Sequence, residues 1–269
     1  MALEWLKTKI WPGGSRASRA FDRYVSSPPS LQNAIDAISG WKTSFPSQYR
    51  LNAGSIETYN DPRIRWAINT FGSLEGCRVL ELEPLDGGHS SMLEAAGAQV
   101  DAVEPNRLAF LRCLITKEVL GLTRSTFWLG DVMGAMENWQ QRYDLIVASR
   151  ALGHLRDPLR FIELAAERTD AIYFWTRPVT ETSMPPLSPQ PGAGPPDAQT
   201  HRLDGIDVRL YRNARRANER ATTEDDERLW LNRDDLLKAL SALGFSDIRQ
   251  CGEQPNDPGW PALSILARR

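Results

Sequence analysis

Between Arg78 and Thr176 the sequence alternates apolar, β-branched runs with amphipathic runs, and this alternation constrains the fold more than any other feature. Strands are predicted over residues 78–83, 99–104, 125–130, 143–149 and 171–176. Helices are predicted between them, at about 90–96, 107–120, 133–141 and 158–167. Right-handed crossovers between parallel strands place such helices on both faces of the sheet. The pattern therefore predicts an α/β fold with a doubly wound, mostly parallel sheet.

The N-terminal region, residues 1–70, is predicted to be a helical cap or arm, because prolines interrupt its short helical patterns. One helix is expected over Leu31–Trp41 and a second is expected to start near Asp61 and Pro62. The first residues are too charged for a signal peptide or membrane span, which leaves a packing arm or a small amphipathic anchor. The aromatic residues of this region either pack in a core or wall an acceptor pocket. They are Trp41, Phe45, Tyr49, Tyr59 and Trp66.

Residues 71–269 are predicted to form the main domain, with a proline-rich insertion at about 178–230. The prolines of residues 178–200 are too many for a regular element, so this stretch is expected to be a surface linker or a lid. A helix capped by Asn232 and stopped by Gly244 comes next. Two further strands, pairing as a hairpin, would complete a seven-stranded sheet with an antiparallel edge strand.

The composition of the 269 residues excludes several classes of protein. With 41% hydrophobic and 25% charged residues, the chain needs neither disulfides nor metal to hold its fold. The formal net charge is −2 with scattered basic residues, so no nucleic-acid or anionic-membrane surface is expected. The densest basic stretch, Arg209–Arg220, is expected to be a solvated helix face or flexible arm, or else an acidic-acceptor site. Three distant cysteines without CxxC spacing favour a reducing, cytoplasmic location.

Ligand-binding features are predicted where the first three strands end. Gly87 and Gly88 lie in a tight turn before a helix, which gives a ligand access to backbone N–H groups. Glu104 ends the second strand, where a carboxylate can accept hydrogen bonds from both ribose hydroxyls of a nucleoside. Asp131 follows the third strand, where it could meet an adenine amino group. Because ligands bind at the carboxyl ends of parallel strands, these residues are expected to share one site.

These segments resemble the class I, Rossmann-like S-adenosylmethionine-dependent methyltransferases. VLELEPLDGGHSSML looks like the cofactor loop, VEPN like the ribose turn, LGD like the adenine turn and YDLIVASRALGHLRDP like the fourth strand with its loop. Other segments, including RLNAGSIETYNDPRIRWA, resemble a mostly uncharacterised bacterial subgroup. The resemblance implies the fold and S-adenosylmethionine as cofactor, but no acceptor. The cofactor-binding residues it implies are Glu81, Glu83, Leu85, Gly87, Gly88, His89, Glu104, Pro105, Asn106, Gly130, Asp131, Val132 and Ser149.

The chain departs from the family pattern at two places. Glu83 and Leu85 replace two glycines of the pattern E/D-x-G-x-G-x-G. Either the cofactor site is weakened or lost, or Glu83 pairs with the ammonium of the methionine moiety. At the second place Gly153 stands where the subgroup carries an aromatic residue, which predicts a wider acceptor pocket.

His154 follows the fourth strand and is the candidate catalytic residue, a base that takes a proton from an acceptor hydroxyl. The alternative is a loop residue that caps the next helix or shapes the pocket. His89 is expected to be structural or to contact the cofactor, His201 to be exposed, and Asp157 to cap a helix. No metal is expected, because the aspartates near the site do not form a cluster.

The sequence thus predicts an S-adenosylmethionine-dependent methyltransferase acting on a hydroxyl of a small molecule or glycan. The alternative is a non-catalytic cofactor-binding or protein-interaction module with the same fold. An RNA methyltransferase is disfavoured because no basic patch with interleaved aromatic residues is present. A homo-oligomer is left open.

Overall fold

The structure, a computed structural model, describes residues 24–176, 198–213, 228–251 and 262–269. Its centre is a seven-stranded sheet with the order β3-β2-β1-β4-β5-β10-β9. The strands are β1 (Arg78–Leu82), β2 (Gln99–Glu104), β3 (Ser125–Leu129), β4 (Leu145–Ser149), β5 (Ala171–Thr176), β9 (Asp247–Cys251) and β10 (Leu263–Arg268). The first five strands of this order are parallel, and β10 is antiparallel to both of its neighbours. The predicted doubly wound, mostly parallel sheet is confirmed.

The position of the antiparallel strand differs from the prediction. The last two strands do pair with each other, but antiparallel β10 lies between β5 and β9, so the edge strand is β9. Burial explains the order. Residues Leu263 to Ala267 are all buried, as a strand covered on both faces requires, whereas β9 carries Asp247, Arg249 and Gln250 and is partly or fully exposed throughout.

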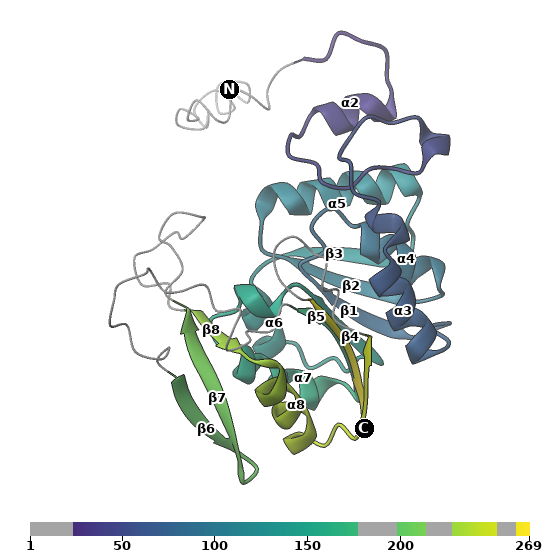
Figure 1. The fold of residues 1–269 in the computed structure, drawn as a ribbon. Helices are drawn as coiled ribbons and strands as arrows, with labels where there is room; N and C mark the ends of the chain where they lie inside the picture. The colour runs from purple at the N-terminus through teal and green to yellow at the C-terminus, as the bar shows by residue number, and fades with distance from the viewer. Residues whose placement is uncertain (1–23, 177–197, 214–227, 252–261) are drawn as a thin grey trace, which may run out of the picture.

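Helices cover the two faces of the sheet in separate groups (Figure 1). On one face α3 (Pro62–Phe71), α4 (Gly88–Ala95) and α5 (Arg107–Leu120) pack around Ile64, Leu93 and Cys113. On the other face α6 (Val132–Asn138), α7 (Pro158–Arg168) and α8 (Arg233–Ala242) pack around Phe161 and Leu240. The predicted helices agree with these bounds to within about three residues.

Several helix starts follow the expected capping chemistry. Asp61 caps α3 with Pro62 in the first helical position, and Asp157 caps α7 in the same way. Asn232 caps α8 by accepting a hydrogen bond of 2.7 Å from the Asp235 N–H. Gly244 is left-handed just after this helix, as its predicted role as a stop requires.

The N-terminal region contains less helix than predicted. Helix α2 covers Leu31–Asp36 only, and the chain then turns through Gly40, whose φ is 86°. Two short 3₁₀ turns follow, η1 (Ser47–Tyr49) and η2 (Thr58–Asn60). Helix α2 lies beside α5 (Figure 1), and between them Phe45 is buried with Trp41 packed edge-on against it. Core packing is therefore the role of these two aromatic rings.

A second, three-stranded antiparallel sheet of order β6-β7-β8 lies within the predicted insertion. Its strands are β6 (Ala198–Leu203), β7 (Ile206–Asn213) and β8 (Arg228–Leu231). The expectation of no regular element up to residue 200 is wrong for residues 198–200, while the proline-rich residues up to 197 lie outside the described part. Arg209 lies on a strand rather than a helix, because Val208 and Leu210 alternate with it and are buried against the α7 and α8 side of the core. Residues 214–220 of the basic stretch also lie outside the described residues, as do the first 23 residues.

Candidate functional site

The β1–α4 loop, residues 83–87, has a left-handed backbone at alternate positions. The φ angles are 54° at Glu83, 61° at Leu85 and 79° at Gly87. Glycine adopts this conformation freely, whereas a residue with a side chain is destabilised by roughly 1–2 kcal/mol. The two residues that replace glycines therefore keep the backbone path that glycines ordinarily provide, and they do so under strain.

Contacts from two neighbouring elements hold the strained loop in place. The Leu85 N–H donates to Oε2 of Glu104 at 3.0 Å, and the Leu85 carbonyl accepts a weak hydrogen bond from the Cys113 thiol at 3.6 Å. The Thr116 hydroxyl donates to the carbonyl of Asp86 at 2.7 Å. Strained backbone persists where the surroundings determine it in this way, and it is concentrated at functional sites.

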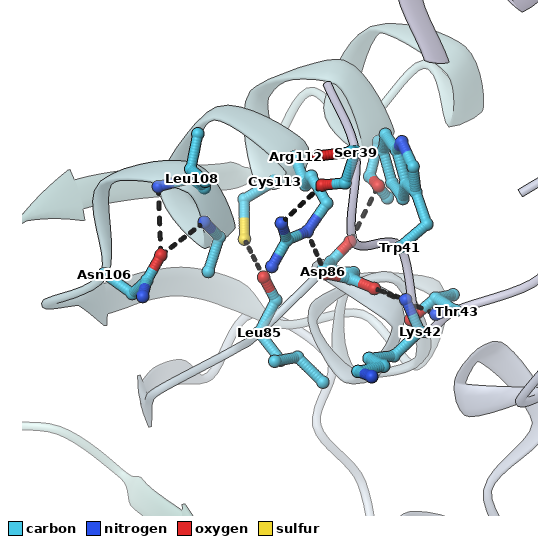
Figure 2. Close-up of polar contacts among 12 residues, drawn as sticks. Ser39, Trp41, Lys42, Thr43, Leu85, Asp86, Asn106, Leu108, Arg112 and Cys113 are labelled. Carbon is cyan, nitrogen blue, oxygen red and sulfur yellow. Dashed lines mark hydrogen bonds and ion pairs between the residues drawn. The ribbon is translucent and has the colours of Figure 1, made fainter. Parts of the chain in front are cut away.

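Asp86, which the sequence reasoning missed, ties the loop to the N-terminal region (Figure 2). Its fully buried carboxylate accepts hydrogen bonds from the backbone N–H groups of Lys42, at 2.6 Å, and Thr43, at 2.8 Å. The same carboxylate pairs with Nε of Arg112, whose Nη1 also donates to the carbonyl of Ser39 at 3.1 Å. The only signal in the sequence was an acidic residue directly before Gly87, which carries no information about a partner more than 40 residues away.

Glu104 lies at the carboxyl end of β2 and is 4% exposed. Its carboxylate accepts hydrogen bonds from the N–H groups of Leu85 and, at 2.8 Å, Asn106. Burial raises the pKa of Glu104 to about 7, and the nearby negative charge of Glu83 contributes to the rise. The carboxylates of Glu83 and Glu104 are thus close enough to interact, and a positively charged ligand would reduce the repulsion between them.

The residues after Glu104 and after β3 form the adjacent part of the same edge. Asn106 caps α5 by accepting from the N–H groups of Leu108 and Ala109, each at 3.0 Å. The Gly130 N–H donates to the carbonyl of Glu104 at 3.2 Å, which joins the ends of β3 and β2. Asp131 caps α6 through the Gly134 N–H at 2.7 Å, so its other carboxylate oxygen is the one left for a ligand.

Three exposed leucines lie along this edge, one after each of the first two strands and one at the end of the third. Leu85, Leu108 and Leu129 are 41%, 43% and 47% exposed. Pro105 precedes the α5 cap, and Val132 is buried as the first residue of α6. Apolar side chains beside a buried carboxylate are the surroundings that a flat heteroaromatic base with an attached sugar would require.

Glu81 and His89 lie beneath the loop, in a buried polar network. Glu81 accepts a hydrogen bond from the Ser90 hydroxyl, and burial raises its pKa. His89 lies between two carboxylates, with Nε2 at 3.1 Å from Oδ2 of Asp61 and Nδ1 at 3.9 Å from Oε1 of Glu81. Asp61 also pairs with Arg63. Through these contacts His89, on α4, links this helix to Asp61 at the start of α3 and to Glu81 on β1.

Gly88, the first residue of α4, lies against η2. A side-chain carbon at this position would overlap the hydroxyl and Cβ of Thr58. Glycine at this position allows the close approach of the N-terminal region to α4.

His154 is brought to the loop from the neighbouring strand β4. It ends the 3₁₀ turn η3 (Leu152–His154), and its Nδ1 lies 2.5 Å from Oε2 of Glu83. The side chains of His154 and Glu83 are 53% and 17% exposed. Ser149 is the last residue of β4, and Arg150 after it is left-handed with a φ of 66°. Two of the predicted site residues, Glu83 and His154, are thus in direct contact.

His201 and Gly153 are two further positions that the sequence singled out. His201 is exposed on β6, in the second sheet. Apart from its two chain neighbours, no described residue has an atom within 4 Å of where a Cβ of Gly153 would stand. Within the described part of the chain, no three His, Cys, Asp or Glu side chains cluster as a metal site would need. None of the helices among the described residues combines the length and apolarity required to cross a membrane.

Comparison with known proteins finds similarity at the level of structure. No family model matches the sequence, and no curated protein matches it. The N-terminal domain of EvdMO1, solved with SAH bound, superposes with a TM-score of 0.63 at 21% identity over 88% of this chain and 95% of that one. Magnesium protoporphyrin IX methyltransferase (ChlM) from Synechocystis PCC 6803 has a TM-score of 0.51 at 18% identity, over 77% of this chain and 79% of that one. The chain has the class I methyltransferase fold.

A third match supports the same assignment. An S-adenosylmethionine-dependent methyltransferase from Mesorhizobium loti has a TM-score of 0.54 at 15% identity, over 78% of this chain and all (100%) of that one. Identities this low show the fold alone. What the class I methyltransferase fold does in this chain has to be argued from its own site.

Proposed function

We propose that the protein is an S-adenosylmethionine-dependent methyltransferase. The observation that carries the proposal is the β1–α4 loop, which keeps a left-handed backbone at Glu83 and Leu85 although neither residue is glycine. Backbone strain of this kind persists where the surrounding structure determines it, and it clusters at functional sites. The matched proteins crystallised with S-adenosylmethionine or its product are further support.

The residues at the sheet edge fit the parts of this cofactor. The carboxylate of Glu104 would accept hydrogen bonds from the ribose hydroxyls, beside Pro105 and Asn106. Asp131 and the backbone of Gly130 and Val132 would meet the adenine, with the exposed leucines against its faces. The nearby negative charges of Glu83, in the loop, and Glu104, at the end of β2, suit a ligand that carries a sulfonium and an ammonium group.

The methionine end would lie along the loop toward Gly87 and the end of β4 at Ser149. S-adenosylmethionine, when bound, supplies an electrophilic methyl group whose transfer is intrinsically favourable. The protein's task is then to align the acceptor, exclude water and receive a proton. His154 would take the last of these roles, because its exposed imidazole follows the carboxyl end of β4.

For the acceptor we propose a hydroxyl group of a small molecule or glycan. A hydroxyl must lose its proton during transfer, which gives the exposed imidazole of His154 a function. The N-terminal domain of EvdMO1 was also solved in the presence of SAH and D-fucose, a sugar with free hydroxyls, at a TM-score of 0.62 and 19% identity to this chain. Gly153 has no side chain, and a Cβ built there would meet no described residue other than its chain neighbours within 4 Å, which is compatible with an acceptor beside His154.

A non-catalytic module is the second candidate, because two side chains stand where the fold ordinarily has glycines. Calorimetric titration with S-adenosylmethionine and S-adenosylhomocysteine tests binding, and a screen of hydroxyl acceptors then separates the enzyme from a cofactor-binding module. We expect micromolar binding that Glu104→Gln weakens at least tenfold and the surface control Glu163→Gln leaves unchanged. Absence of binding to folded wild-type protein would exclude the enzyme. Binding with no S-adenosylhomocysteine produced in a hydroxyl-acceptor screen favours the module.

A further inference from the structure

The contact between Glu83 and His154 joins the loop after β1 to the turn after β4. These two strands are neighbours in the sheet, with Glu81 paired to Val147, so their carboxyl ends lie side by side. Backbone contacts fix both residues: the Glu83 N–H donates to the carbonyl of Val103 at 2.9 Å, and the His154 N–H donates to the carbonyl of Ala151 at 2.9 Å. The backbone on both sides of the pair is therefore hydrogen-bonded, and the two side chains meet between these anchored positions.

We propose that Glu83 is a positioning residue that sets the tautomer and orientation of His154. The carboxylate accepts a hydrogen bond from the Nδ1–H group, which leaves Nε2 without a proton and free to act as an acceptor. The inference rests on the proposed function, since it assigns His154 the role of base. Glu83 then assists deprotonation of the acceptor through His154, in addition to any contact that it makes with the cofactor.

The proton balance of the transfer follows from this arrangement. The acceptor hydroxyl gives its proton to Nε2 of His154 while its oxygen bonds to the methyl carbon; the carbon–sulfur bond breaks and its electron pair stays on sulfur. The imidazole then carries a positive charge, and the adjacent Glu83 carboxylate stabilises that charge without itself taking the proton. The acceptor, now an ether, and S-adenosylhomocysteine are the products.

The conformation of Glu83 supports a specific role for its side chain. With a φ of 54° the residue holds a left-handed backbone that glycine would adopt freely. A glycine at this position could not reach His154. Strain is retained here together with a side chain that bonds the candidate base, as expected where function opposes stability.

The first test is ¹⁵N nuclear magnetic resonance of histidine-labelled protein, at a pH where the imidazoles are neutral. The chain has only three histidines, and His154→Gln assigns the signals of that ring. We expect His154 to carry its proton on Nδ1 in the wild type, and Glu83→Gly to shift the ring toward the Nε2–H form. His201, exposed on β6, is the internal control. An Nε2–H tautomer in the wild type, or a tautomer unchanged by Glu83→Gly, would overturn the proposal.

Glu83→Gly suits this experiment because glycine accepts the backbone conformation, so the variant is expected to fold. Calorimetry with S-adenosylhomocysteine on the same variant separates positioning of His154 from cofactor binding. With an acceptor in hand, we expect Glu83→Gly to lower kcat on the order of 10²-fold with KM for the acceptor changed only a few-fold. Glu83→Gln, which keeps a hydrogen-bond acceptor but no charge, should recover part of the loss.

The outcomes for the two proposals are distinguishable. If the wild type binds no S-adenosylhomocysteine, the proposed function fails whatever the tautomer of His154. If it binds and turns over but Glu83→Gly keeps the wild-type kcat, the positioning role fails and the enzyme stands.

Discussion

The carboxylate of Asp86 lies 2.6 Å from Nε of Arg112, in an ion pair that is buried between the β1–α4 loop and the N-terminal region. The same carboxylate accepts hydrogen bonds from the N–H groups of Lys42 and of buried Thr43, so its removal leaves a buried guanidinium and these two donors without their partner. We expect Asp86→Ala to lower the free energy of unfolding by about 3–5 kcal/mol, measured by chemical denaturation.

The matched control is the solvent-exposed pair of Arg160 and Glu163 on α7. Glu163→Ala is expected to cost under about 1 kcal/mol, because exposed ion pairs contribute little. Equal effects at the two sites would show that the loop does not depend on its bonds to the N-terminal region.

Leu85 tests whether the loop is strained. Its φ of 61° is left-handed and its side chain is 41% exposed, so Leu85→Gly should be more stable than Leu85→Ala by about 1 kcal/mol. At Leu114, which is 39% exposed in the middle of α5, the order should reverse by a similar amount. Thermal or denaturant unfolding of the four variants measures both differences. The same order at both positions would contradict the left-handed backbone.

Gly88 tests the close packing of the N-terminal region on α4. A methyl group at this position overlaps Thr58, so Gly88→Ala is expected to cost roughly 1–3 kcal/mol, as overpacking does. Gly153→Ala meets no described residue other than its chain neighbours within 4 Å and should change the stability by less than about 0.5 kcal/mol. Amide hydrogen exchange across residues 58–60 would report whether the first variant loosens η2; unchanged protection and stability would contradict the packing.

The alternation of apolar runs was sufficient to predict the central sheet, because period and spacing are local properties of the sequence. The order of β9 and β10 was missed because it depends on which strand is buried on both faces, and that is decided by tertiary packing. Strands β6 and β7 were missed for a related reason. The prolines before these strands favoured an irregular stretch. Val208 and Leu210, however, are apolar at alternate positions, as in a strand with one buried face.

At the site, the sequence located the strand ends but not the contacts between them. Glu104 and Asp131 were predicted as site residues from their positions at strand ends, where the ligands of parallel sheets bind. The partners of Asp86 lie 43 and 26 residues away in sequence, and Glu83 and His154 are 71 residues apart. Long-range pairs of this kind follow from the folded geometry and leave no local pattern.

The raised pKa of Glu104 predicts how stability changes with pH. The group titrates at its ordinary value of 4.5 in the unfolded chain and at about 7 in the folded protein. Between these values the unfolded chain has lost the proton that the folded protein still holds, so the stabilisation present below pH 4.5 is lost as the pH rises to about 7. A tenfold difference in proton affinity between the two states is worth about 1.4 kcal/mol, so the total loss is roughly 3 kcal/mol.

Glu104→Gln removes this titration while keeping the shape of the side chain. We expect the free energy of unfolding of Glu104→Gln, relative to that of the wild type, to increase as the pH is raised from 4.5 to about 8. Denaturant unfolding at several pH values in this range measures the difference. Glu163→Gln, at an exposed site on α7, should run parallel to the wild type over the same range. A constant offset between Glu104→Gln and wild type would mean that Glu104 is ionised throughout, because its hydrogen bonds from Leu85 and Asn106 outweigh its burial.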